Sequence, residues 1–496
     1  MNSKKIICLL AGIIFCIFQL SLQAQNLENR VDEYTLDNGM KFLLMERHET
    51  PIFSGAIVFK VGGVDEPRGE TGLAHMFEHM AFKGTPVIGT KDYKSELPIL
   101  DEIERVGEEL SLELKKQDKM DSARVGQLRK HLAEIQARQQ QYIVNNEFMH
   151  LYESAGGTSM NAGTGNDITM YYVSLPSNKL ELWMLMESER IKYPVFREFY
   201  KERDVILEER RMRTETQPMG KLEEQMMAIA FVAHPYRNPV VGWMSDISTV
   251  TVAGAKDFHK KYYVPGNAVG ALVGDFKISE IKKLLDQYFG DIPKAPQPSP
   301  VATVEPLPSG ERRIQVEFDA EPQALIGYPK PTIPNYDDYV FDVIDAVLSN
   351  GRTSRFYTAL VKQKQMVLGI STYQGLPGAR YPNLFVIHAV PRQPFGTDTV
   401  EKAIYEELER LKTEPVTPHE LEKVRNQIDA NFIRQLASND QLAFMLGYLQ
   451  VIAGDWRYLL KQREMFKKVS AEDIMNAAKK YFVPRNRIVA TIVSKE

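Results

Sequence analysis

The amino-acid sequence predicts an α+β protein made of two domains of similar plan, with a helical hairpin inserted in the first. Three observations support this fold class: a helix–turn–strand segment that occurs twice, a proline-rich stretch between the two copies, and short apolar runs joined by hairpin signals. The chain has 496 residues, which is enough for two to four domains. The mixture of hairpins and helices favours α+β over a parallel βαβ array.

The N-terminus has the features of an export signal. Lys4 and Lys5 precede an apolar run over residues 6–20, which is too short and poorly flanked for a stable membrane span. Ala24 supplies the small residue for cleavage. We therefore expect residues 1–24 to be a signal peptide and the mature chain to be periplasmic or secreted, with no stable membrane span. An uncleaved membrane anchor is the alternative.

The two cysteines, Cys8 and Cys16, both lie in this segment. The mature chain would then have no disulfides and no thiolate ligands, so any metal must be held by histidine and carboxylate groups. A net charge of −4 gives no reason to expect a nucleic acid as partner. Export and the lack of a glycine-rich phosphate loop argue against nucleotide cofactors.

The first domain is expected over residues 28–292. Short apolar runs on either side of Asp37-Asn38-Gly39 predict a β-hairpin near its start. A helix should follow, with Thr71 as its N-cap and Gly84 as its stop. Its apolar face would consist of Leu73, Met76, Phe77 and Met80.

This helix carries the sequence His75-Met76-Phe77-Glu78-His79. Two histidines four residues apart lie on one face of a helix, one turn above each other, which allows them to bind one divalent metal. Glu78 projects beside the same metal. The pattern H-x-x-E-H is typical of catalytic zinc sites, in which a carboxylate assists a metal-activated water. Ordinary polar residues of a surface helix are the alternative interpretation.

Residues 92–146 are rich in Glu, Lys, Gln and Leu and read as an insertion. Pro98 suits the first turn of a first helix. Apolar residues then recur at helical spacing, at Ile99, Ile103, Val106 and Leu110 and at Val125, Leu128, Leu132 and Ile135. A projecting helical hairpin is therefore expected, whose charges favour a solvated face over a binding site.

Two histidines leave a catalytic zinc one protein ligand short. The helix expected over residues 198–213 offers Glu208 and Glu209, which helical geometry separates by about 100°. Glu209 falls on the stripe that faces the core, where a carboxylate needs a partner such as a metal. We predict Glu209 as the third ligand and Glu202 as a hydrogen-bond partner of a ligand histidine. A salt-bridged surface helix is the alternative.

The end of the first domain recurs at the end of the second. VTVAGAKDFHKKYYVPGN (250–267) aligns without a gap to VSAEDIMNAAKKYFVPRN (469–486), at a constant offset of 219. Each copy predicts a helix, a proline-containing turn and a strand. Chance similarity of two helix–strand junctions is the alternative. Between the copies, the six prolines of residues 293–311 predict an extended linker, and the second domain should cover residues 312–496.

Several segments resemble the pitrilysin/insulinase family of zinc peptidases, and the resemblance covers nearly the whole mature chain. The segments are TGLAHMFEHMAFKGT (71–85), GGTSMNAGTGNDITMYY (156–172), ERDVILEE (202–209), YYVPGNAVGALVGD (262–275) and GRTSRFY (351–357). The resemblance implies two homologous α/β-sandwich domains of the metallopeptidase half-clamshell type, the second without metal. The chain is similar to the zinc-bearing subunits of short family members, such as the mitochondrial processing peptidase beta subunit and bacterial two-subunit peptidases.

By that resemblance, His75, His79 and Glu209 would bind one Zn²⁺ per chain. Glu78 would be the catalytic general base that polarises the zinc-bound water. Glu202 matches the position of a residue that supports a ligand histidine, in agreement with the prediction above.

Asn161 and Ala162 match the family strand that accepts substrate as an added β-strand, which implies peptides or unfolded segments as substrates. The chain departs from the family in two places. The gap of 130 residues between His79 and Glu209 is longer than usual by roughly the size of the insertion. Val361 and Leu368 replace an Arg and a Tyr that usually bind substrate and steady the oxyanion.

We therefore expect a heterodimer with a related, metal-free subunit that supplies the Arg and Tyr. The predicted function is a zinc-dependent endopeptidase that hydrolyses peptides or unfolded segments in a closed chamber. The main alternative is a non-catalytic peptide-binding or scaffold subunit of the same fold. A purely structural zinc site is a third interpretation, but such sites normally have four protein ligands, often cysteines.

Overall fold

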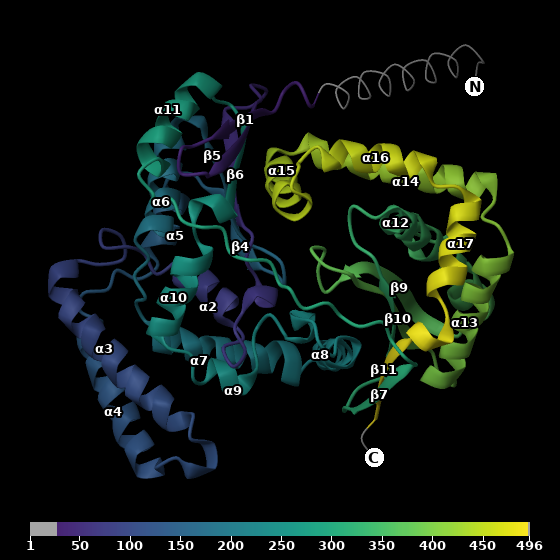
Figure 1. Cartoon of the computed structure of the whole chain (residues 1–496), viewed down its shortest axis with the longest axis horizontal. Coiled ribbons are helices and arrows are strands. Elements are labelled where there is room, and N and C mark those ends of the chain that lie inside the picture. The colour runs from purple at the N-terminus through teal and green to yellow at the C-terminus, as the bar shows by residue number, and fades with distance from the viewer. Residues whose placement is uncertain (1–26, 495–496) are drawn as a thin grey trace.

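A computed structural model describes residues 27–494 of the chain, and the expected signal peptide lies outside the described residues. The chain forms two halves that lie side by side, each built on one β-sheet with helices packed around it (Figure 1). Within the described range, the helices are all too short or too polar to cross a membrane.

The first sheet has six strands in the order β1-β2-β6-β3-β5-β4. The strands are β1 (Asp32–Thr35), β2 (Lys41–Glu46), β3 (Ile52–Phe59), β4 (Thr158–Thr164), β5 (Thr169–Pro176) and β6 (Ala268–Gly274). The predicted hairpin is confirmed: β1 and β2 are antiparallel, and Gly39 takes the φ of +93° that the turn between them requires. Strand β4 lies at an edge of this sheet, with β5 as its one neighbour.

The second sheet has five strands in the order β7-β11-β8-β10-β9. The strands are β7 (Arg312–Glu317), β8 (Ala324–Lys330), β9 (Val367–Leu376), β10 (Asn383–Pro391) and β11 (Ile488–Val493). This order repeats β2-β6-β3-β5-β4, and the parallel pair of β11 with β7 matches that of β6 with β2. The helices α10 (Val252–Tyr262) and α17 (Ala471–Tyr481) lead into β6 and β11, so the predicted repeat is confirmed.

The other helices of the first half are α2 (Leu73–Met80), α3 (Tyr93–Leu114), α4 (Ser122–Gln139), α5 (Glu147–Ser154), α6 (Leu180–Lys192), α7 (Phe199–Arg210), α8 (Pro218–Ala230), α9 (Met244–Ile247) and α11 (Ile278–Phe289). The second half contains α12 (Tyr336–Ser349), α13 (Thr397–Thr413), α14 (Pro418–Ala437), α15 (Asn439–Ala453) and α16 (Tyr458–Lys468). Helices α3 and α4 form a hairpin that projects from the first half (Figure 1). The side chain of Asp92 caps α3 by accepting from Ser95 N–H, so Pro98 lies in the second turn of the helix. The prediction that Pro98 lies in the first turn is therefore wrong.

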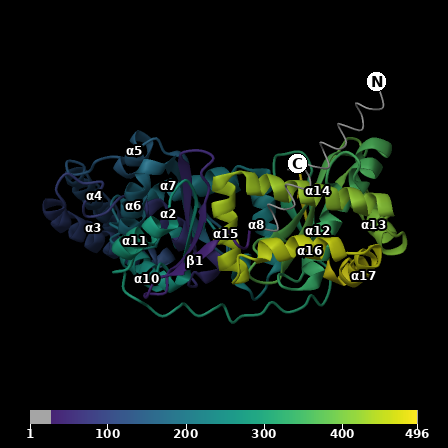
Figure 2. The same cartoon turned by 90° about the horizontal axis from the view of Figure 1, so that it is seen from above.

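One helix of each half packs on the β-sheet of the other half. Helix α15 packs on β3 and β6 of the first sheet, and α8 packs on β7 and β11 of the second. Figure 2 shows α15 and α8 in the middle of the molecule. Successive residues of β3 point to opposite faces of the sheet and so belong to different hydrophobic clusters. Ile57 belongs to the cluster of the first half, whereas Val58 belongs to the cluster that also contains residues of α12 and α15. Gly447 of α15 lies so close to Val58 that an added Cβ would be 2.8 Å from its Cγ2. The shared cores hold the two halves in a fixed arrangement.

Candidate metal centre

Helix α2 begins at Leu73, after Gly72 in the left-handed conformation (φ +94°). The prediction that Thr71 is the N-cap is wrong, because its hydroxyl donates to Asp246 and accepts from Trp243 N–H. The carboxylate of Glu66 takes over this role by accepting from the N–H groups of Gly72 and Ala74, both at 2.8 Å. A side chain from the preceding loop therefore satisfies the free N–H groups at the start of the helix.

The end of α2 also differs from the prediction. The helix ends at Met80, four residues before Gly84. Gly84 has a φ of +90° and lies in the turn that follows, where an added Cβ would be 2.2 Å from the carbonyl oxygen of Ile88. The glycine therefore serves a close backbone contact in the loop after the helix.

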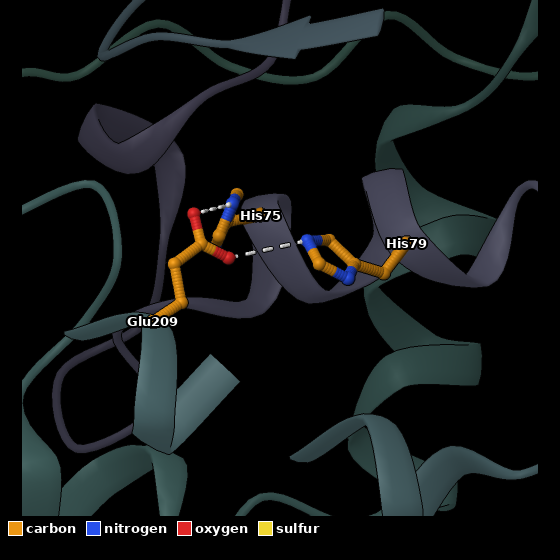
Figure 3. Close-up of side chains that lie close together, drawn as sticks. All are labelled: His75, His79 and Glu209. Carbon is orange, nitrogen blue, oxygen red and sulfur yellow. Dashed lines mark ion pairs between the residues drawn. The ribbon is translucent and has the colours of Figure 1, made fainter. Parts of the chain in front are cut away.

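His75 and His79 lie on one face of α2 and both point to Glu209 on α7 (Figure 3). The Nε2 atoms of His75 and His79 are each 3.5 Å from an oxygen of the Glu209 carboxylate. One donor atom from each of the three side chains lies within 4.8 Å of the others. Among the described residues, this is the one group of three His, Cys, Asp or Glu side chains close enough to share an ion.

The donor set fits a catalytic zinc ion. Two imidazole nitrogens and one carboxylate oxygen are three protein ligands, which leaves the fourth tetrahedral position open. The Nδ1 atom of His79 is held by Glu202 Oε2 at 3.2 Å, so its Nε2 faces the site. His75 is buried, and its Nδ1 has no hydrogen-bond partner in the described structure.

The surroundings of the two histidines give them different pKa values. Burial lowers the pKa of His75 to about 4, so this imidazole is neutral at neutral pH. Burial also acts to lower the pKa of His79, but hydrogen bonds to Glu202 and Glu209 outweigh it and raise this pKa to about 9. A metal ion that binds here would therefore release a proton from His79.

Glu78 is half-buried beside the three donors. The nearby hydroxyl of Thr164, the last residue of β4, acts to lower the pKa of its carboxyl group. Burial raises the pKa of Glu78 above its ordinary value. A carboxylate with a raised pKa is a stronger base than an exposed one, and Glu78 stays outside the group of three that could hold the ion.

Asn161 and Ala162 lie on β4, opposite Tyr172 and Tyr171 of β5. The N–H of Ala162 donates to the side-chain oxygen of its neighbour Asn161 at 2.9 Å, so a side chain satisfies it in place of another strand. Helix α2 packs against β4, which brings this edge strand next to the candidate metal ligands. The two predicted substrate-binding residues thus lie on an edge strand beside the site.

The second half reaches the site through the loop between β9 and β10. Arg380 of this loop pairs with Asp65, the residue before the capping Glu66, at 2.8 Å. Asp167, in the turn between β4 and β5, accepts from Tyr236 O–H at 2.6 Å and from Ala379 N–H at 2.5 Å. The second half therefore fixes both the segment that caps α2 and the turn after β4.

Several residues near the site were not predicted. Arg213 pairs with Glu209 at 2.8 Å, four residues apart, and this spacing could have been read from the sequence. Lys83 pairs with both Glu198 and Glu202, and no local pattern indicates these contacts. The helix expected over residues 198–213 ends at Arg210 and continues as a π-helical turn from Arg211 to Glu215.

Two mixed sheets of matching strand order, with the donor set in the first, give the chain the two-domain fold of M16-like peptidase structures. The chain belongs to the insulinase family, peptidase family M16. The family model matches residues 41–120 and 131–242, and the model of the peptidase M16 inactive domain matches residues 249–428. The unmatched residues 121–130 lie in the projecting hairpin.

The zinc protease PqqE of Helicobacter pylori is 26% identical over 482 residues, which cover 95% of each chain. The probable zinc protease PqqL of Escherichia coli is 24% identical over 267 residues, which cover 52% of this chain and 23% of PqqL. The crystal structure of a protease from H. pylori has a TM-score of 0.77 at 24% identity and covers 93% of this chain and 99% of its own. The predicted family and fold class are therefore confirmed.

Proposed function

We propose that the protein is an exported zinc-dependent endopeptidase in which Glu78 is the general base. The observation that carries this proposal is the convergence of His75, His79 and Glu209, with Glu78 beside them. These three side chains would hold the zinc ion, which when bound would polarise water and the substrate carbonyl. The relatives named as zinc proteases support the same chemistry.

The task of Glu78 follows from its surroundings. Its carboxylate accepts a proton from the attacking water and then delivers it to the leaving amine. Burial keeps the basicity of this carboxylate high and outweighs the opposite effect of the nearby Thr164 hydroxyl. Helix α2, which carries Glu78, packs against β4, so the base lies next to the strand that would bind substrate.

Substrate would bind as an added strand along the free edge of β4. An extended peptide would take the N–H of Ala162 as a donor in place of the Asn161 side chain. Folded domains present few free extended segments, so this mode selects peptides and unfolded segments. The expected signal peptide, together with a relative described as periplasmic, supports action outside the cytoplasm.

The partner that we propose is a related, metal-free subunit. Val361 is half-buried and packs against the hydrophobic core, whereas Leu368 is exposed on β9. Neither side chain can donate a hydrogen bond to an oxyanion. A heterodimer would supply the missing Arg and Tyr and close the chamber.

A second function has support from the same region. The match of residues 249–428 to an inactive domain, with Val361 and Leu368 in the second half, also suits a non-catalytic peptide-binding subunit. In that case the first half would bind extended peptides without hydrolysing them.

The substitution Glu78→Gln separates the two functions. It keeps the shape of the side chain and removes the base, so zinc content should stay at one per chain while cleavage of an unfolded peptide is lost. Glu208→Gln is the matched control, because Glu208 is exposed and pairs with Arg211. A wild-type chain that binds zinc but cleaves no peptide, with or without periplasmic extract from its own organism, would favour the binding subunit.

A further inference from the structure

The base of the projecting hairpin surrounds one buried arginine. Arg197, which is 1% exposed, precedes α7, and its Nε lies 2.9 Å from both carboxylate oxygens of Glu96 on α3. Gln139 on α4 donates to the same carboxylate at 3.0 Å. Both helices of the hairpin therefore hold Arg197 through a fully buried ion pair. Removing one partner of such a pair is costly, because it leaves an uncompensated buried charge.

The remaining N–H groups of Arg197 bind the loop that follows α2. Its Nη1 donates to the carbonyl oxygens of Lys83 and Ile88 at 3.0 and 2.9 Å, and its Nη2 donates to that of Thr85 at 2.8 Å. The guanidinium thus fixes the course of the chain directly after the predicted zinc helix. The loop, α7 and the hairpin meet at this one side chain.

From this loop, Lys83 reaches back to the metal centre. Its ammonium group pairs with Glu202 and, at 3.4 Å, with Glu198. Glu202 in turn holds Nδ1 of His79 at 3.2 Å. Gln140, just after α4, donates to Glu198 at 3.2 Å. A continuous series of polar contacts therefore runs from the hairpin to a predicted metal ligand.

We propose that the helical hairpin of α3 and α4 supports the metal site and that Arg197 and Lys83 are its positioning residues. The hairpin fixes Arg197 and Glu198, these two residues fix Lys83, and Lys83 holds Glu202 against His79. The ring of His79 is then oriented before the metal arrives. The proposal rests on the proposed function only in that the three donors bind zinc, and it requires no peptidase activity.

The first test is the zinc affinity of Lys83→Met, measured by competition with a chelator on the full mature chain. Groups that orient a ligand histidine typically change metal affinity by about 10- to 100-fold, so we expect a loss of about 10-fold. Lys201→Met is the matched control: Lys201 also pairs with Glu198, at 2.8 Å, but among the described residues it forms no ion pair with Glu202. Its affinity should equal that of the wild type, and Lys83→Arg should recover part of the loss.

The second test asks whether the hairpin itself contributes. Glu96→Gln should weaken zinc binding, whereas Glu109→Gln should leave it unchanged, because Glu109 pairs with Arg105 and Arg124 on the exposed part of the hairpin. If Glu96→Gln does not fold, Gln140→Ala, which removes one hydrogen bond, replaces it and should weaken zinc binding to a smaller extent.

The outcomes separate this inference from the proposed function. A wild-type chain that binds no zinc would overturn both. A wild-type chain that binds zinc, together with folded Lys83→Met and hairpin-base variants that bind it equally well, would overturn only the support role. Equal weakening in Glu109→Gln would also overturn it, because the effect would then come from general loss of stability.

Discussion

The two halves of the molecule repeat one order of five strands, yet within residues 27–494 only the first half gathers a set of metal donors. In the first half, α2 packs against the edge strand β4, and its two histidines meet Glu209 from another helix. In the second half, α12 packs against the edge strand β9 and carries Asp338, Asp342 and Asp345.

Asp338, Asp342 and Asp345, three of the four aspartates of α12, each contact a different neighbour. Asp338 pairs with Lys330, Asp342 accepts from Gln462 at 3.4 Å, and Asp345 accepts from Thr372 at 2.5 Å. Each of these aspartates therefore has its own partner, whereas His75 and His79 both lie next to the single carboxylate of Glu209. The shared strand order alone is therefore not enough for a metal site. The site also needs a third donor from a neighbouring helix.

The largest effect should come from removing that third donor. Glu209→Gln replaces an anionic ligand by a weak neutral one, so zinc should be lost during dialysis against a chelator that leaves the wild type at one ion per chain. Asp345→Asn is the control in the second half, because Asp345 of α12 contacts Thr372 of β9. This variant should leave zinc content unchanged. Equal zinc loss in both variants would contradict the distinction between the halves. Metal analysis of the dialysed proteins provides the measurement.

The next effect concerns the support of His79. Glu202→Gln weakens the hydrogen bond that orients the imidazole, and we expect zinc affinity to fall by about 10- to 100-fold. Chelator competition gives the dissociation constant, and Glu208→Gln on the same helix serves as control. An unchanged constant would mean that helix α2 alone orients the ring.

A smaller effect is expected on the edge strand. Ala162→Pro removes an N–H that now donates to a side chain, so the sheet should stay intact while one hydrogen bond to an added substrate strand is lost. One such bond contributes about 0.5–1.5 kcal/mol, which corresponds to a rise in KM of about 2- to 10-fold. Zinc content should not change. Steady-state kinetics with an unfolded peptide would show the rise, and an unchanged KM would place substrate elsewhere.

A separate effect, on stability and not on zinc or substrate binding, belongs to the second half and depends on pH. Burial, with the neighbouring charge of Asp338, raises the pKa of Asp342 to about 8, against about 3.9 for an unfolded aspartate. A raised carboxyl pKa contributes stability that is full below pH 3.9 and is lost as the pH rises through 8. Asp342→Asn should therefore become more stable relative to the wild type between pH 4 and 8. Melting temperatures measured across this range check it, and a constant difference would contradict it.

The features that the sequence predicted correctly depend on short-range spacing. The pair His75 and His79, the turn at Gly39 and the repeated helix–strand segments are patterns within a few turns of chain. The choice of Glu209 over Glu208 also followed from helical geometry, and the structure places Glu209 beside both histidines.

The features that it did not predict depend on contacts between distant segments. Thr71 does not cap α2 because its hydroxyl donates to Asp246, which lies 175 residues later in the chain. Arg197 acquires its role from Glu96, which lies 101 residues earlier in the chain, and Lys83 acquires its role from Glu198, which lies 115 residues later. The exchange of α8 and α15 between the two sheets leaves no local pattern, because a helix packs in the same way on either sheet.

The most direct test of the central claim is the location of zinc in the chain. Anomalous diffraction at the zinc edge should show one site in the first half, with His75, His79 and Glu209 as ligands at about 2.0–2.2 Å and with Glu78 outside the coordination shell. A peak among the aspartates of α12, or no peak from a crystal grown with zinc, would contradict the account.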